Sequence, residues 1–98
     1  MIPLPENKPM TIKRARLRYS NAIDAYRFAR DRGFIGWLIK DRIEQVVIWA
    51  YILKRASHNK PEFVAIYRDA FYWAYKMGVR VPDETLSFWF KTYNGGLK

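Results

Sequence analysis

The sequence contains no cysteine, which excludes disulfides, thiolate metal sites and cysteine catalysis. It has a single histidine, His58, placed between polar residues, so the usual group for acid and base catalysis near neutral pH is almost missing. There is no histidine pair at helical spacing, no glycine-rich phosphate loop and no serine in a nucleophile-elbow context. These absences predict a protein that is not an enzyme and that uses no cofactor.

Acidic residues are also few: the chain has nine Asp and Glu, half as many as its 18 Lys and Arg. They are scattered along the chain. Asp41 and Glu44 lie one helical turn apart and could share a hard cation, but their neighbours Lys40 and Arg42 favour a solvated charged face. We therefore expect no metal site.

Long apolar runs are missing as well. The longest, Val46 to Leu53, has eight residues, whereas a membrane span needs about 20. Residues Met1 to Met10 contain three prolines and no apolar segment of the kind found in secretory signals, so they predict an extended arm. We expect no membrane span and an intracellular location, in the cytoplasm, the nucleoid or a virion.

The 98 residues suit one compact domain, and the half of them that are hydrophobic predict a folded chain. We expect an extended N-terminal arm over residues 1–10, a helical domain over 11–93 and a flexible tail over 94–98. Apolar and small residues recur at alternating steps of three and four, which predicts a first amphipathic helix over 12–32. Its inward positions are Ile12, Ala15, Tyr19, Ala22, Tyr26 and Ala29.

Capping residues define the expected helix ends. Thr11 is expected to cap the first helix and Gly33 to end it. A second helix is predicted over 35–56, and its apolar second half indicates the central helix of a bundle or a contact with a partner. Asn59 is predicted as the N-cap of a third helix that ends at Gly78, and Asp83 as the N-cap of a short last helix. The predicted fold is all-α, a small single-domain bundle, orthogonal or up-and-down, of three long helices plus a short C-terminal helix.

The net charge of +9 is an argument about partners, because an excess of cations raises the local concentration of polyanions. No acidic residue occurs between Lys8 and Asp24, and the planar fork of arginine suits phosphate. The predicted nucleic-acid-binding residues lie on the first helix and are Lys13, Arg14, Arg16, Arg18, Arg27 and Arg30. We expect this basic protein to bind nucleic acid, DNA above all, through the arm and the first helix.

Aromatic residues are abundant, with four Trp, seven Tyr and six Phe. On the third helix Tyr72 and Tyr75 are expected to point outward, with Arg68 and Lys76 beside them. Such a surface suits stacking on bases or contact with a protein partner. The alternative is that these rings pack against the arm or the last helix.

Two short resemblances add hypotheses about partners. Ala29, Gly33 and Ile39 have the spacing of a helix-turn-helix, although Arg32 and Arg42 occupy positions that this motif fills with apolar side chains. Residues 83–90 resemble the sliding-clamp-binding peptide of replication and repair proteins, which implies that Leu86, Trp89 and Phe90 enter the clamp pocket. Asp83 replaces the glutamine of that peptide, and a short helix that closes a core has the same spacing.

The rival to nucleic-acid binding is a protein-protein interaction or structural role. Examples are an accessory subunit, a viral or replication-associated component, or an inhibitor that binds an acidic protein surface. The apolar segment from Val46 to Leu53 would then form the seam of a homo-oligomer. A third interpretation, attachment of the first helix to an anionic membrane surface, requires a clearer hydrophobic edge than that helix has.

Overall fold

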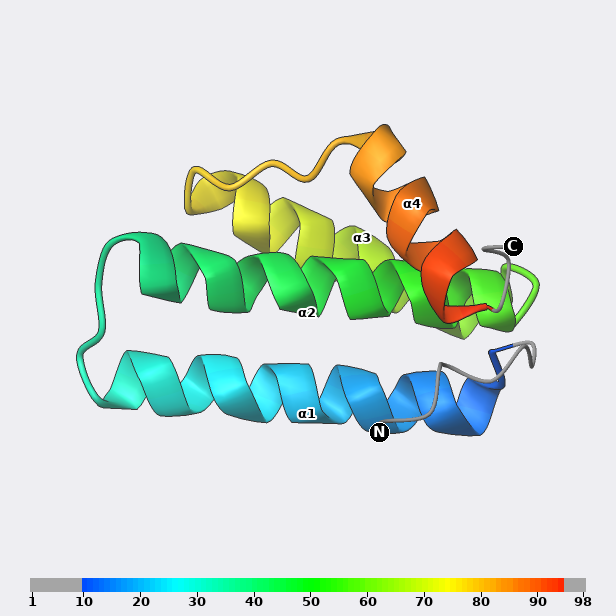
Figure 1. Ribbon diagram of the computed structural model, residues 1–98, viewed down its shortest axis with the longest axis horizontal. Coiled ribbons are helices and arrows are strands. Elements are labelled where there is room, and N and C mark those ends of the chain that lie inside the picture. Colours follow the sequence, from blue (N-terminus) through cyan, green and yellow to red (C-terminus); the bar gives the residue numbers. More distant parts are fainter. Residues whose placement is uncertain (1–9, 95–98) are drawn as a thin grey trace, which may run out of the picture.

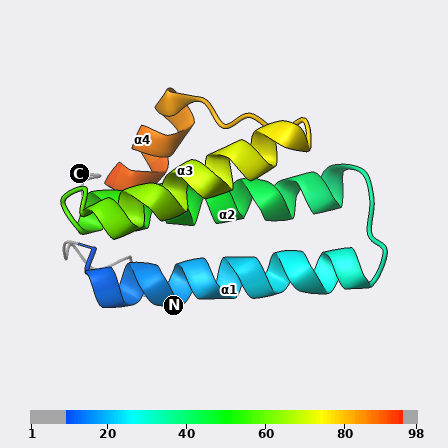
Figure 2. The same cartoon turned by 180° about the vertical axis from the view of Figure 1, so that it is seen from behind.

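The computed structural model describes residues 10–94, and within this range it is helical and contains no strand. The helices are α1 (Ile12–Asp31), α2 (Trp37–Ala56), α3 (Pro61–Lys76) and α4 (Asp83–Tyr93). In Figure 1, α1 and α2 run antiparallel side by side and α4 lies near the end of α2, while Figure 2 shows α3 crossing the face of α2. The predicted all-α bundle of three long helices and one short helix is confirmed.

Helix α2 is the centre of the bundle, because α1, α3 and α4 each pack against it. Its buried residues are Ile43, Val46, Val47, Ile48, Trp49, Ala50, Ile52 and Leu53. The prediction of a central helix is confirmed. All residues from Val46 to Leu53 are buried within the chain except Tyr51, which is partly exposed. This segment therefore belongs to the core, and a homo-oligomer stays a prediction.

Three of the predicted helix ends are confirmed. The hydroxyl of Thr11 accepts a hydrogen bond from the backbone N–H of Arg14 at 3.1 Å and so caps α1. Gly33 follows α1 and Gly78 follows α3, with φ of 75° and 80°. These left-handed angles favour glycine and end both helices in the predicted way.

The predicted caps of α3 and α4 are wrong. Asn59 has a φ of 62° and its N–H donates to the carbonyl of Lys54 at 2.9 Å, so it ends α2 instead of starting α3. Asparagine tolerates this left-handed conformation better than most residues. Asp83 is the first residue of α4 and makes no side-chain capping bond, because Pro82 occupies the N-cap position. Its carboxylate still lies at the positive end of the helix dipole.

Several boundaries differ by one or two residues from those expected. Helix α2 begins at Trp37 because Gly36, with a φ of 73°, precedes it in a non-helical conformation. Met10 was expected in the arm and Asn94 in the tail, yet Met10 is buried and its N–H donates to Asn94 Oδ1 at 2.6 Å. Both residues therefore belong to the packed domain. The rest of the predicted arm and tail lies outside the described residues.

Replacing Gly78 by alanine should lower the free energy of unfolding by about 1 kcal/mol. The reason is that at positive φ the Cβ of alanine lies too close to the backbone carbonyl that follows. No neighbouring atom lies within 4 Å of the new Cβ, so the cost comes from the backbone alone. Urea unfolding would measure it. Gly78→Asn is the control, and its free energy of unfolding should fall by less, since asparagine adopts this conformation more readily. Equal losses for the two variants would contradict the prediction.

Candidate nucleic-acid interface

The six cations predicted to bind phosphate are all exposed on α1, but they do not form one surface. The inward seam of α1 separates them, since each residue turns the helix by about 100°. Arg16, Arg27 and Arg30 lie on the side of α1 that faces α3, whereas Arg14 and Arg18 lie on the other side. The sequence prediction treated these residues as a single group, and the structure divides them.

Cation–π contacts show which neighbour each side faces. The guanidinium of Arg16 lies 5.4 Å from the ring centroid of Phe63 in α3. The guanidinium of Arg18 lies 5.8 Å from the ring of Trp49 in α2, and that ring lies 4.7 Å from Tyr93 in α4. One side of α1 therefore faces α3, and the other faces α2 near the place where α4 ends. Lys13 shares an open surface depression with Arg16.

Few of the cations are neutralised by carboxylates. Within residues 10–94 the ion pairs are Arg30 with Asp31, at 3.4 Å, and Arg42 with Asp41, at 2.9 Å. Both pairs join neighbouring residues on the surface, where such contacts stabilise little. The α1 cations without a carboxylate partner in that range are Lys13, Arg14, Arg16, Arg18 and Arg27. Within the described part of the chain no carboxylate pairs with these side chains, and their charge suits them to attract an anion.

A groove of about 300 Å³ runs between α1 and α3, with α2 as its floor. The side chains from α1 are Tyr19, Ile23, Tyr26, Arg27 and Arg30, those from α2 are Ile43 and Val46, and those from α3 are Asp69, Ala70 and Trp73. Half of the Trp73 surface is exposed. The Trp73 Nε1–H donates to the hydroxyl of Tyr26 at 3.4 Å, so the indole is held at the groove.

Charges of both signs meet at this groove. Burial raises the pKa of Tyr19 above its usual value, the negative charge of Asp69 raises it further, and the positive charge of Arg27 opposes the increase. Asp69 is the only carboxylate among the described residues that line the groove, whereas Arg27 and Arg30 are both cationic there. The balance of charge at the groove is therefore positive.

The outer face of α3 carries the aromatic residues that the sequence indicated. Tyr72 and Tyr75 are 62% and 64% exposed, so they do not pack against α4. The ammonium of Lys76 lies 5.4 Å from the ring centroid of Tyr72. The prediction that both rings point outward is confirmed.

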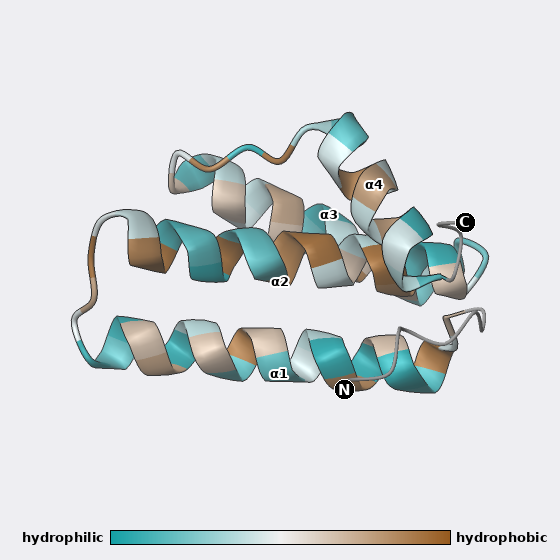
Figure 3. Cartoon of the chain, in the orientation of Figure 1, coloured by the Kyte–Doolittle hydropathy of each residue, from teal (hydrophilic) through white to brown (hydrophobic). Residues whose placement is uncertain are grey.

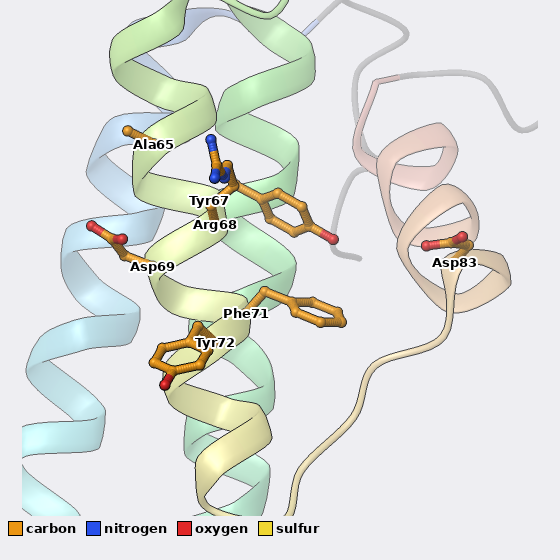
Figure 4. Close-up of a pocket in the computed structure, with 7 residues that line it drawn as sticks. All are labelled: Ala65, Tyr67, Arg68, Asp69, Phe71, Tyr72 and Asp83. Atoms are coloured by element: carbon orange, nitrogen blue, oxygen red, sulfur yellow. The ribbon is translucent and has the colours of Figure 1, made fainter.

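An open depression of about 640 Å³ lies beside these rings, between α3 and the start of α4. Figure 4 shows Tyr67 and Phe71 extending from α3 toward the side on which Asp83 lies, with Arg68 and Tyr72 on the outer face. Burial raises the pKa of Tyr67, and Asp83 adds to this effect. This depression is lined by two carboxylates, those of Asp69 and Asp83, and by only one guanidinium, that of Arg68. It therefore suits phosphate less well than the groove does.

The structure does not support the two short resemblances. A helix-turn-helix sets its helices at about 90–120°, whereas α1 and α2 form an antiparallel pair (Figure 1). In the segment that resembles a clamp-binding peptide, Leu86 is completely buried and Trp89 and Phe90 pack against the core. These three residues close the bundle, and α4 would have to leave α2 before they could enter a clamp pocket.

Sequence reasoning missed two features of the surface. Trp73 follows Ala70 by three residues, which puts it at the edge of the inward stripe of α3, but the pattern does not show which neighbour that edge meets. Phe34, Ile35 and Trp37 are large apolar residues exposed near the turn between α1 and α2. Glycine at positions 33 and 36 was the available signal for an irregular turn there.

Comparisons of this chain with protein-family models, with curated proteins and with solved structures find no match. Within residues 10–94, no helix is both long enough and apolar enough to cross a membrane.

Proposed function

We propose that this chain binds DNA through the α1–α3 face, which we define as Lys13, Arg16, Arg27, Arg30 and Trp73. The observation that carries the proposal is that Arg27 lines the groove edged by Trp73 and is exposed, with no carboxylate partner in residues 10–94. Lys13 and Arg16 are exposed and unpaired in the same range, and they line a separate depression nearer the start of α1. Cations of this kind bind phosphates and release condensed counterions.

The dimensions of α1 suit several phosphates. At 1.5 Å per residue, Lys13 and Arg30 are about 25 Å apart along the helix, which corresponds to roughly seven base pairs of B-form DNA. Contacts with phosphates fix position and carry no sequence information. We therefore expect affinity for DNA in general, with Trp73 able to stack on an unpaired base.

Fluorescence anisotropy with labelled duplex and single-stranded DNA tests the proposal. The variant Arg16→Gln/Arg27→Gln/Arg30→Gln should bind at least about tenfold more weakly than the wild type, because three phosphate contacts are lost. The slope of log affinity against log salt concentration should fall by about 2 to 3 for the duplex. Glutamine is a good helix former, so α1 should persist in the variant.

A matched control comes from the other side of the same helix. Arg14→Gln/Arg18→Gln/Arg32→Gln removes the same charge and also two cation–π contacts, those of Arg18 with Trp49 and of Arg32 with Phe28. It should weaken binding much less. Equal losses in both variants would show that total charge decides affinity and would overturn the assignment to this face. Unchanged affinity in the first variant would overturn DNA binding by these residues.

A second candidate function is contact with a protein partner through the outer face of α3. Its support is the open depression beside α4, together with the exposed rings of Tyr72 and Tyr75. Exposed tyrosines next to Arg68 and Lys76 are frequent in the centres of protein interfaces. An accessory subunit would use this surface to bind its partner. This second function becomes the preferred one if the DNA titrations show no binding.

A further inference from the structure

The turn between α1 and α2 exposes three large apolar side chains. Phe34, Ile35 and Trp37 are 42%, 84% and 78% exposed, and we call them the apolar tip. The turn forms one end of the α1–α2 pair in Figure 1, and Figure 3 shows hydrophobic colouring in the turn and at the beginning of α2. An exposed cluster of this kind marks a surface that binds something apolar.

The backbone holds the tip away from the bundle. Gly33 and Gly36 flank Phe34 and Ile35, and both have a positive φ that other residues rarely adopt. No neighbouring atom lies within 4 Å of the position that a Cβ would take at either glycine, so nothing packs against the backbone at these two points. The tip therefore protrudes, and a broad apolar surface can approach it.

Cations surround the tip. Between residues 30 and 42 there are four, Arg30, Arg32, Lys40 and Arg42, against two acids. Both acids form ion pairs with a neighbouring arginine, Asp31 with Arg30 and Asp41 with Arg42. Glu44 lines a depression together with Trp37 and Lys40, and it has no cationic partner in residues 10–94. Arg32 and Lys40 have no carboxylate partner in that range either, so the balance of charge around the tip is positive.

We propose that the apolar tip inserts into the surface of a lipid bilayer that contains anionic headgroups. Phe34, Ile35 and Trp37 would enter the boundary between headgroups and acyl chains, where indole rings are particularly favourable. Arg32 and Lys40 would stay at the level of the headgroups and attract their negative charge. The tip supplies the hydrophobic edge that α1 itself lacks, and the protein binds to the surface without crossing it.

A second copy of the chain fits this tip less well. A symmetric contact between two tips would place the cations of one rim against those of the other. The three side chains of a protruding turn also bury much less than the roughly 800 Å² per partner that a stable protein interface needs. Charge and shape together therefore favour the bilayer.

Sedimentation with vesicles tests the proposal on the full chain. The wild type should pellet with vesicles of phosphatidylcholine mixed with phosphatidylglycerol, and much less with phosphatidylcholine alone. Ile35→Ser/Trp37→Ser should bind the mixed vesicles at least about tenfold more weakly, because two large apolar side chains no longer insert. The control Leu17→Ser/Phe88→Ser removes two other exposed apolar side chains, 61% and 53% exposed, away from the tip and should bind like the wild type.

A conservative variant separates insertion from simple charge attraction. Trp37→Phe keeps an apolar ring and should still pellet, but it should lose most of the blue shift in tryptophan emission that vesicles cause in the wild type. Equal binding by the wild type and the Ile35→Ser/Trp37→Ser variant would overturn the proposal, and so would the absence of binding to mixed vesicles. Light scattering that shows a dimer abolished by the same double variant would assign the tip to a second copy instead. Failure of the DNA titrations leaves this test unaffected, because the varied residues are different.

Discussion

Replacing Ile52 by alanine should lower the free energy of unfolding by about 3 to 5 kcal/mol. The side chain of Ile52 has no exposed surface and lies in the helix against which all the others pack. Removing its outer carbons therefore leaves a cavity inside the core, in the helix that holds the bundle together. Domains of this size are stabilised by about 5 to 15 kcal/mol, so the loss is a large share of the total.

Thermal and urea unfolding followed by circular dichroism would measure this effect. The melting temperature should fall by about 20 °C, since 1 kcal/mol corresponds to roughly 4–8 °C in a domain of this length. Leu17→Ala is the matched control, because it removes an aliphatic side chain that is 61% exposed on α1. It should change stability by less than about 0.5 kcal/mol. A similar loss in both variants would contradict the central position of α2.

The sequence was sufficient to predict the class of the fold. Alternating steps of three and four define the inward side of α1, and the apolar second half of α2 requires cover on several sides, which only a central helix receives. The predictions of helix ends that were wrong depend on the backbone conformation of single residues. Asn59 is a good N-cap by type, yet in this chain it adopts a left-handed conformation and ends α2. Composition does not distinguish these two uses of asparagine.

The candidate site was predictable only in part. The type and exposure of the basic residues follow from the charge pattern of α1, and the structure places all of them at the surface. Their division into two sides follows from helical geometry, but which side adjoins a groove depends on where α3 and α4 pack. Arg16 contacts Phe63, which is 47 residues away in the sequence, and no local pattern contains that information.

The exposed tip was the least predictable feature. Ile35 was expected to begin the second helix, predicted over residues 35–56. In the structure Gly36 interrupts the helix and turns Ile35 and Trp37 outward. Sequence hydropathy measures how apolar a residue is, and it contains no information on whether the fold covers that residue.

Replacing Leu86 by alanine should lower the free energy of unfolding by about 2 to 4 kcal/mol. Leu86 is the only completely buried residue of α4, and α2 is the only helix among the described residues against which α4 packs. The lost contact therefore falls on the one interface that holds α4 in place. Trp89 and Phe90 are only half-buried, and they cannot replace a side chain that lies inside the core.

Hydrogen exchange separates a role in the core from a role as a partner peptide. In the wild type, amides in the second half of α4 should exchange slowly, because a packed helix opens rarely, whereas Leu86→Ala should accelerate them more than those of α2. Phe88→Ala is the control, since Phe88 is 53% exposed and its ring contacts only Trp89 among the aromatic residues described. That variant should keep α4 protected. Rapid exchange throughout α4 in the wild type would contradict its role in closing the core and would restore the partner-peptide hypothesis.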